Sequence, residues 1–189
     1  MTMMGKLNFP SVREGIRRLD LEDGDTFVEI GAGHGAGLRE IANLGVTLNR
    51  IVCVEISEHF RKELQRTIDD LPRELPVEVS GEDCREMPYL EDGSVDKIFG
   101  MNLVYFLDPL PHYLQEMHRV LKPGGVVVFG CKFYALPEGT KEFVNTKPKP
   151  IVKAMEEAGF NVTVSKVEVD SGKDRTKNFI EIRGQSQDN

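Results

Sequence analysis

The chain has 189 residues, of which 40% are hydrophobic and 29% charged, and this length and composition are typical of one ordinary globular domain. Its formal net charge of −7 argues against tight nucleic-acid binding, because a phosphate backbone is gripped by a basic surface. Three scattered cysteines without a CxxC pair argue against a disulfide framework and a zinc site. Because the sequence shows neither a signal peptide nor a membrane-spanning run, we expect a cytoplasmic protein.

Strand-like apolar runs alternate with helix-length amphipathic segments in the first half of the chain. The first helix should bury Ile16 and Leu19 on one face. Ser57 is a natural N-cap for a helix that runs towards Asp70, and Pro72 lies where that helix should end. We expect strands over residues 26–30, 50–55 and 77–80, and helices over residues 9–19, 35–44 and 57–70.

The second half of the chain continues this alternation and then changes to paired strands. Residues 96–101 and 126–130 read as strands, the latter fully apolar, as in a strand buried on both faces of a parallel sheet. Helices are expected over 109–121, which the KPGG sequence at 122–125 should stop, and over 150–158. Residues 162–169 and 178–182 read as two strands around a polar hairpin, and the C-terminal GQSQDN as a frayed end. The pattern indicates an α/β fold with a mostly parallel sheet and a terminal hairpin.

The strongest local motif is a glycine-rich segment, residues 29–37 (EIGAGHGAG), between an expected strand and an expected helix. Ligands of doubly wound sheets bind at this point, since glycine lets the backbone approach a ligand and the helix N-terminus offers free N–H groups. The same residues also satisfy the dinucleotide pattern as Gly31-x-Gly33-x-x-Ala36, and a tight turn without a ligand is a further reading. The loop alone therefore leaves the ligand open.

An acidic residue follows at the distance expected of a ribose-binding carboxylate. Glu55 ends the second expected strand, where it can accept hydrogen bonds from both ribose hydroxyls. Ile56, the next residue, can pack against the face of a purine. A solvated acid is the plainer reading, but ligand crevices form at strand ends, which favours the binding role.

Further motifs follow in order, and together they resemble the class I methyltransferase family in its small "type 11" form. Residues 29–35 are similar to motif I of that family, and Glu55 to its motif II acid. Asp83 and Cys84 lie in a segment, GEDCREMP, that is similar to the family's GDAxxLP sequence. Residues 92–96 (DGSVD), 117–125 (MHRVLKPGG) and 158–160 (AGF) match three more motifs, so the resemblance covers residues 25–183.

The resemblance implies a Rossmann-like, doubly wound, mostly parallel seven-stranded sheet with a C-terminal antiparallel hairpin, in one domain over residues 1–189. Its parts would be an N-terminal cap helix (1–24), a cofactor-binding half (25–131), a substrate-side half with the terminal hairpin (132–184) and a frayed tail (185–189). It also implies S-adenosylmethionine as the cofactor, with Asp83 reading the adenine amino group and a small molecule as the methyl acceptor. The residues expected to bind the cofactor are Glu29, Gly31, Ala32, Gly33, His34, Gly35, Glu55, Ile56, Asp83, Cys84, Asn102 and Leu103.

In-line methyl transfer needs no fixed catalytic residue or metal ion, because the sulfonium methyl is already electrophilic and the protein must chiefly position the reactants and exclude water. No catalytic residue is therefore predicted. The fourth strand leads into residues 100–105 (GMNLVY) without the [DN]PP[YF] motif of amino methyltransferases that act on nucleic acids and glutamine, which weakens those acceptor classes. His34 stands where the family commonly has small or hydroxyl residues, and from the loop it can either reach the cofactor's carboxylate or cover the pocket.

Four side chains are candidate acceptor contacts: Tyr105, His112, Tyr113 and Tyr134. Plainer interpretations are that Tyr105 belongs to the core, that His112 is a solvated residue at a helix start, and that Tyr113 is a core-facing helix residue. Residues 132–149 either fold down as a small apolar lid or form an ordinary strand-to-helix connection. Two other functions stay open, namely a methyltransferase-fold binding module without transfer activity and a nicotinamide-dependent oxidoreductase. Asp83, the RVLKPGG sequence and the hairpin argue against the oxidoreductase. A homodimer stays open as the assembly.

Overall fold

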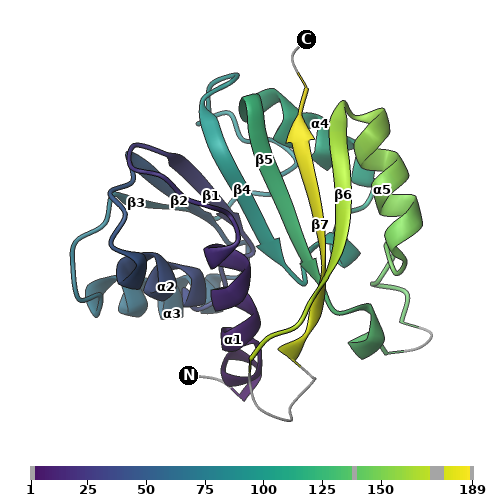
Figure 1. The fold of residues 1–189 in the computed structure, drawn as a ribbon. Coiled ribbons are helices and arrows are strands. Elements are labelled where there is room, and N and C mark those ends of the chain that lie inside the picture. The colour runs from purple at the N-terminus through teal and green to yellow at the C-terminus, as the bar shows by residue number, and fades with distance from the viewer. Residues whose placement is uncertain (1–2, 138–139, 171–176, 188–189) are drawn as a thin grey trace.

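Seven strands form one sheet in the computed structural model, which describes residues 3–137, 140–170 and 177–187 (Figure 1). The strand order is β3-β2-β1-β4-β5-β7-β6, with β1 to β5 parallel and β7 antiparallel to both β5 and β6. The predicted seven-stranded, mostly parallel sheet with a C-terminal antiparallel hairpin is confirmed. The strands are β1 (Thr26–Ile30), β2 (Arg50–Val54), β3 (Val77–Ser80), β4 (Val95–Met101), β5 (Leu121–Cys131), β6 (Phe160–Val167) and β7 (Phe179–Ser186).

Helices cover both faces of the sheet (Figure 1). α1, α2 and α3 pack on one face and α4 and α5 on the other, and each layer encloses its own cluster of buried apolar side chains. No helix in the described part of the chain is both long and apolar enough to cross a membrane. The helices are α1 (Met3–Arg17), α2 (Ala36–Leu44), α3 (Glu58–Asp69), α4 (Leu110–Val120) and α5 (Pro148–Glu157), with the short 3₁₀ turns η1 (Val104–Phe106) and η2 (Phe133–Ala135).

The central strands are mostly apolar because both of their faces are buried. In β1, Phe27 points into the layer of α1 and α2, whereas Val28 and Ile30 point into the layer of α4. In β5, Val127 and Val128 alternate between the two layers in the same way. Full burial of side chains of this kind stabilises the fold by about 1.5–3 kcal/mol each.

The ends of α3 and α5 follow the expected chemistry. Ser57 caps α3, since its hydroxyl accepts a hydrogen bond from the Phe60 N–H at 3.4 Å. The helix ends at Asp69, so Pro72 lies beyond its end. Gly159 follows α5 with a φ of +95°, a left-handed conformation that only glycine adopts without strain.

The N-terminal helix and β5 both begin earlier than the sequence indicates. α1 begins at Met3 and ends at Arg17, so Leu19 is buried in the loop after the helix. β5 begins at Leu121, which pairs with Val95, and the register with β4 shifts beyond that pair. The KPGG sequence therefore lies within a distorted strand rather than in a loop, with Gly124 at a φ of +77°.

The C-terminal strand is longer than predicted. Residues 184–186, expected to lie in the frayed tail, belong to β7, where Gln185 pairs with Val126 of β5 and with Asn161 of β6. Because β7 lies between two strands, the ladders on both sides satisfy its backbone groups whatever the polarity of its side chains. Of the expected polar hairpin, residues 171–176 lie outside the described residues.

Candidate ligand-binding site

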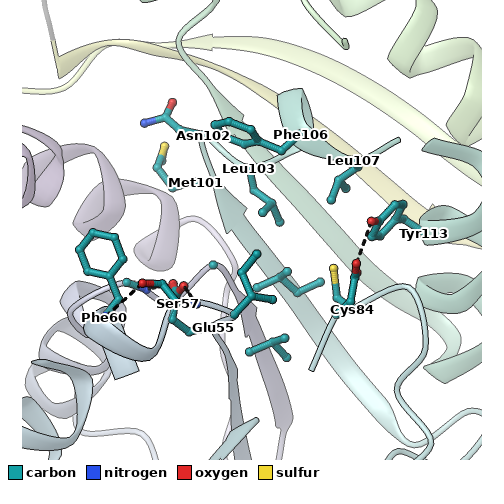
Figure 2. Close-up of a pocket in the computed structure, with 16 residues that line it drawn as sticks. Glu55, Ser57, Phe60, Cys84, Met101, Asn102, Leu103, Phe106, Leu107 and Tyr113 are labelled. Carbon is teal, nitrogen blue, oxygen red and sulfur yellow. Dashed lines mark hydrogen bonds between the residues drawn. The ribbon is translucent and has the colours of Figure 1, made fainter. Parts of the chain in front are cut away.

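A pocket with a volume of about 360 Å³ opens beyond the carboxyl ends of β1, β2 and β4 (Figure 2). Eight of the twelve predicted cofactor residues line it: Gly31, Gly33, Glu55, Ile56, Asp83, Cys84, Asn102 and Leu103. The other lining residues are Ile30, Val54, Ser57, Phe60, Met101, Phe106, Leu107 and Tyr113. The carboxyl ends of parallel strands meet at one edge of the sheet, which is why motifs distant in sequence converge here.

The glycines of the loop serve different purposes. Gly31, Gly33 and Gly35 all have positive φ values, of +70°, +56° and +82°. A Cβ on Gly33 would meet no atom nearer than 4.0 Å, so its Cα faces open space at the pocket. A Cβ on Gly35 would lie 2.9 Å from atoms of Leu64 and Thr67, and Gly35 does not line the pocket. Gly33 thus leaves room for a ligand, whereas Gly35 leaves room for α3.

Glu55 is a fixed carboxylate at the pocket. Its Oε2 accepts a hydrogen bond from the Gly33 N–H at 2.9 Å, and its Oε1 accepts one from the Ser57 N–H at 2.9 Å. The residue is only 7% exposed. Each carboxylate oxygen has a further lone pair, so the group can accept two more hydrogen bonds without moving. This arrangement suits a ligand with two neighbouring hydroxyls.

A second acidic group lies at another part of the pocket. Asp83 Oδ1 accepts a hydrogen bond from the Arg85 N–H at 3.0 Å, and Oδ2 accepts one from the Tyr113 hydroxyl at 3.1 Å. The Arg85 guanidinium lies 5.4 Å from the centre of the Tyr113 ring. Burial, together with the charge of Asp83, raises the pKa of Tyr113, so the phenol stays protonated and can donate a hydrogen bond. Figure 2 shows Tyr113 across the pocket from Glu55.

The end of β4 forms an apolar wall. Met101, Leu103, Phe106 and Leu107 line this side, and Phe106 remains 49% exposed (Figure 2). Asn102 has a φ of +56°, which asparagine tolerates better than most residues. Such conformations concentrate at functional sites, where the surrounding structure holds them in place.

The segment after β5, expected to be a lid or an ordinary connection, is fixed where it meets η1. The Val144 N–H donates to the Tyr105 carbonyl at 2.9 Å. The Asn145 side-chain amide donates to the carbonyls of Val104 and Leu107 at 2.8 and 2.7 Å. The Phe143 ring packs on the Phe106 ring with centroids 5.1 Å apart. At residues 143–145 the connection therefore braces the apolar wall; residues 138–139 lie outside the described residues.

The candidate acceptor contacts separate in the structure. Tyr113 lines the pocket. Tyr105 is buried in the core and hydrogen-bonds to Asn102 Oδ1 at 3.3 Å, so the core interpretation fits it. His112 is exposed in a shallow surface hollow outside the pocket. Tyr134 is outside the lining and donates to the Asn178 carbonyl at 2.9 Å.

Four residues that we expected to bind the cofactor do not line the pocket: Glu29, Ala32, His34 and Gly35. The alternation of β1 places Glu29 on the α2 side with Phe27, so its carboxyl lies against Gly37, where a Cβ would be 2.4 Å from Oε1. Burial, and then the charge of Glu55, raises the pKa of Glu29 to about 8. His34 lines a separate hollow beside α3, and its carbonyl accepts a hydrogen bond from the Thr67 hydroxyl at 2.8 Å.

The other lining residues carry little signal in the sequence. Ser57 and Phe60 lie in the first turn after Glu55, and that position was the one available signal. Phe106 and Leu107 belong to an apolar run that reads equally well as core.

Cys84 lines the pocket as a thiol, because burial and then Asp83 raise its pKa to about 12. No group of three or more His, Cys, Asp or Glu side chains among the described residues could hold a metal ion.

Comparison with known proteins connects this site to one family. Residues 28–129, more than half of the chain, match the model of a family described as a methyltransferase domain. The human thiol S-methyltransferase TMT1B is 32% identical over 120 residues, which are 62% of this chain and 46% of that protein. Phosphoethanolamine N-methyltransferase 1 of Triticum aestivum is 25% identical, over 92% of this chain and 34% of that protein. The chain spans between 31% and 46% of the length of such curated relatives.

Solved structures share the fold at lower sequence identity. A chain of the complex between the Haloferax volcanii Trm112 methyltransferase activator and a methyltransferase superposes with a TM-score of 0.79 at 20% identity, covering 98% of this chain and 92% of that chain. Haemonchus contortus phosphoethanolamine N-methyltransferase 2, solved with S-adenosylhomocysteine, gives a TM-score of 0.74 at 16% identity, covering 94% and 52%.

Proposed function

The chain belongs to the methyltransferase domain family, as its motifs predicted, and from this premise we propose that it transfers a methyl group from S-adenosylmethionine to a small, uncharged acceptor. One observation carries the proposal: the glycine loop, Glu55 and Asp83, which are far apart in sequence, line the same pocket. A bare structural turn would not need a fixed carboxylate and open space above Gly33.

The residues of the pocket fit the chemical groups of this cofactor. Glu55 has free lone pairs for the two ribose hydroxyls, and the open space at Gly33 admits a ligand close to the backbone. Ile56, which is largely exposed, offers an apolar surface to a purine face, and Asp83 offers acceptors to its edge. When bound, S-adenosylmethionine supplies an electrophilic methyl group. The chain's own part is to orient the cofactor and to keep water from the apolar wall at β4.

The lining of the pocket supports an uncharged acceptor. Met101, Leu103, Phe106 and Leu107 form its β4 side, and none of the sixteen lining residues is lysine, arginine or histidine. A phosphorylated acceptor would place its charge beside Glu55 and Asp83 without a cation among the described lining residues. A thiol, the acceptor class in the name of the human relative, suits this lining, because it is uncharged below its ordinary pKa of about 8.5.

Two measurements test the proposal. Isothermal titration should detect S-adenosylhomocysteine binding to the full chain and no comparable response to NAD. Incubation with isotopically labelled S-adenosylmethionine and a panel of aliphatic thiols, phenols and phosphorylated amines, read by mass spectrometry, should yield a labelled product from an uncharged acceptor. Binding without a product from any acceptor would favour a non-catalytic binding module. Binding of NAD alone would favour an oxidoreductase.

A further inference from the structure

Two side chains from separate elements meet at one end of the pocket. Asp83 comes from the segment after β3, and Tyr113 comes from the first half of α4. The Tyr113 hydroxyl donates to Asp83 Oδ2 at 3.1 Å, and both residues line the pocket. Tyr113 is 5% exposed, so the ring is held by the core and its hydroxyl is aimed at a fixed point.

Other hydrogen bonds also hold the segment after β3 against α4. The Met87 N–H donates to Glu116 Oε1 at 2.5 Å, and the Arg119 guanidinium donates to the carbonyls of Met87 and Leu90 at 3.2 and 3.1 Å. These contacts tie the segment after Asp83 to α4 at positions beyond Tyr113. The bond between Tyr113 and Asp83 therefore acts on the orientation of one carboxylate rather than on the fold.

Asp83 has a reason to need such a restraint. Its side chain is 48% exposed, and an exposed carboxylate is free to rotate into water unless a partner holds it. Arg85 binds it from the surface, through its N–H at 3.0 Å and its guanidinium at 3.3 Å. Among the described donors to Asp83, the Tyr113 hydroxyl is the one whose residue lines the pocket.

We infer that Tyr113 is a specificity residue of the cofactor pocket, which acts by orienting Asp83 so that the pocket selects a purine with a 6-amino group over one with a 6-oxo group. The inference rests on the proposed function, since it concerns the purine of that cofactor. A carboxylate has about four lone-pair sites, and the three hydrogen bonds from Arg85 and Tyr113 leave one free acceptor site, on Oδ1. An amino group can donate to this site, whereas a 6-oxo group would set oxygen against oxygen.

The test compares two ligands that differ at this one position. Isothermal titration of the full chain with S-adenosylhomocysteine and with S-inosylhomocysteine, its 6-oxo counterpart, gives a selectivity ratio for each variant. Tyr113→Phe, which keeps the ring, should lower the ratio roughly three- to tenfold, the effect of one net hydrogen bond. Tyr89→Phe removes a phenol hydroxyl of a residue outside the pocket lining and should leave the ratio unchanged.

A double-mutant cycle separates this role from a general effect on folding. In an Asp83→Asn background, adding Tyr113→Phe should change the ratio no further, because the hydroxyl acts through the carboxylate. A ratio unchanged in Tyr113→Phe, or a fall that persists beside Asp83→Asn, would overturn the inference and leave the proposed function intact. A wild-type chain that binds the two ligands equally would also overturn the inference alone. A wild-type chain that binds neither ligand would overturn both.

Discussion

The two walls of the pocket are built differently. The wall from β1 and β2 consists of backbone and one carboxylate: Gly31, Gly33 and Glu55 lie within 25 residues of one another in the sequence. The wall from β4 and η1 consists of apolar side chains, and residues 143–145, which follow β5, hold it in place. The first wall is local in sequence and rigid through dihedral angles and hydrogen bonds. The second depends on packing between distant segments.

We propose that this difference separates recognition of the cofactor from recognition of the acceptor. A backbone cradle presents the same shape whatever the neighbouring side chains are, so it suits a ligand that does not change. A wall of aromatic and aliphatic side chains can be altered one residue at a time. We therefore expect changes in the first wall to abolish cofactor binding and changes at residues 143–145, which brace the second wall, to spare it.

The largest effect is expected at Gly33. Gly33→Val should abolish S-adenosylhomocysteine binding, because a β-branched residue is strained at a φ of +56° and its side chain would enter the open space at the pocket. The matched control is Gly45→Val, which introduces the same side chain at a φ of +77° after α2, where a Cβ would meet no atom within 4 Å and the residue does not line this pocket. Titration of both variants with S-adenosylhomocysteine separates the effect of backbone strain from the effect of a side chain that blocks the pocket. Wild-type affinity in Gly33→Val would show that the loop is only a structural turn.

The next effect is expected at Glu55. Glu55→Ala should weaken S-adenosylhomocysteine binding by tenfold or more, roughly, since hydrogen bonds to a charged group are each worth about 1.5–3 kcal/mol. The variant also leaves the N–H groups of Gly33 and Ser57 without their carboxylate. Circular dichroism should show an intact fold. Glu78→Ala, on β3 outside the pocket, is the control; equal dissociation constants in the two variants would place the ribose elsewhere.

A smaller effect is expected at the brace of the second wall. Asn145→Ala removes the donor to the Val104 and Leu107 carbonyls and should lower the free energy of unfolding by about 1–3 kcal/mol. The dissociation constant of S-adenosylhomocysteine should stay within about twofold, because the first wall is untouched. Urea denaturation and titration measure the two quantities, with the exposed Asn161→Ala as the control. A large loss of cofactor affinity would show that the walls are coupled.

The smallest effect on cofactor binding is expected at Glu29, which lies behind the first wall and does not line the pocket. Its pKa is raised to about 8, from an ordinary value of 4.5, so between these pH values the folded chain holds a proton that the unfolded chain releases. Stability should therefore fall as pH rises from about 4.5 to about 8, on the order of 1 kcal/mol per pH unit. Glu29→Gln, which cannot ionise, should flatten this slope in denaturation measured at several pH values. An unchanged slope would mean that Glu29 has a counter-charge or lies nearer to water.

The sequence was sufficient where structure depends on short-range chemistry. The strands β1 to β4, the cap at Ser57, the positive-φ glycines and the position of Glu55 all follow from neighbouring residues. Local patterns suffice for them because each depends on a hydrophobic period, a dihedral preference or a cap hydrogen bond within a few positions, and Glu55 is located by its place at the end of β2. The convergence of Asp83 and Asn102 on the same pocket also followed, since parallel strands end at one edge of a sheet.

Only the tertiary structure decided which way the buried and partly buried side chains point. β1 is buried on both faces, so its sequence does not show which face of the sheet Glu29 occupies and which Val28 occupies. The packing of α2 decides that Glu29 lies on the α2 side. The polar residues 184–186 became strand because β5 and β6 lie on either side of them. Tyr113 reaches Asp83 across 30 residues of sequence because α4 packs beneath the segment after β3. These outcomes depend on contacts between elements that are distant in the sequence, so no short sequence pattern contains both partners.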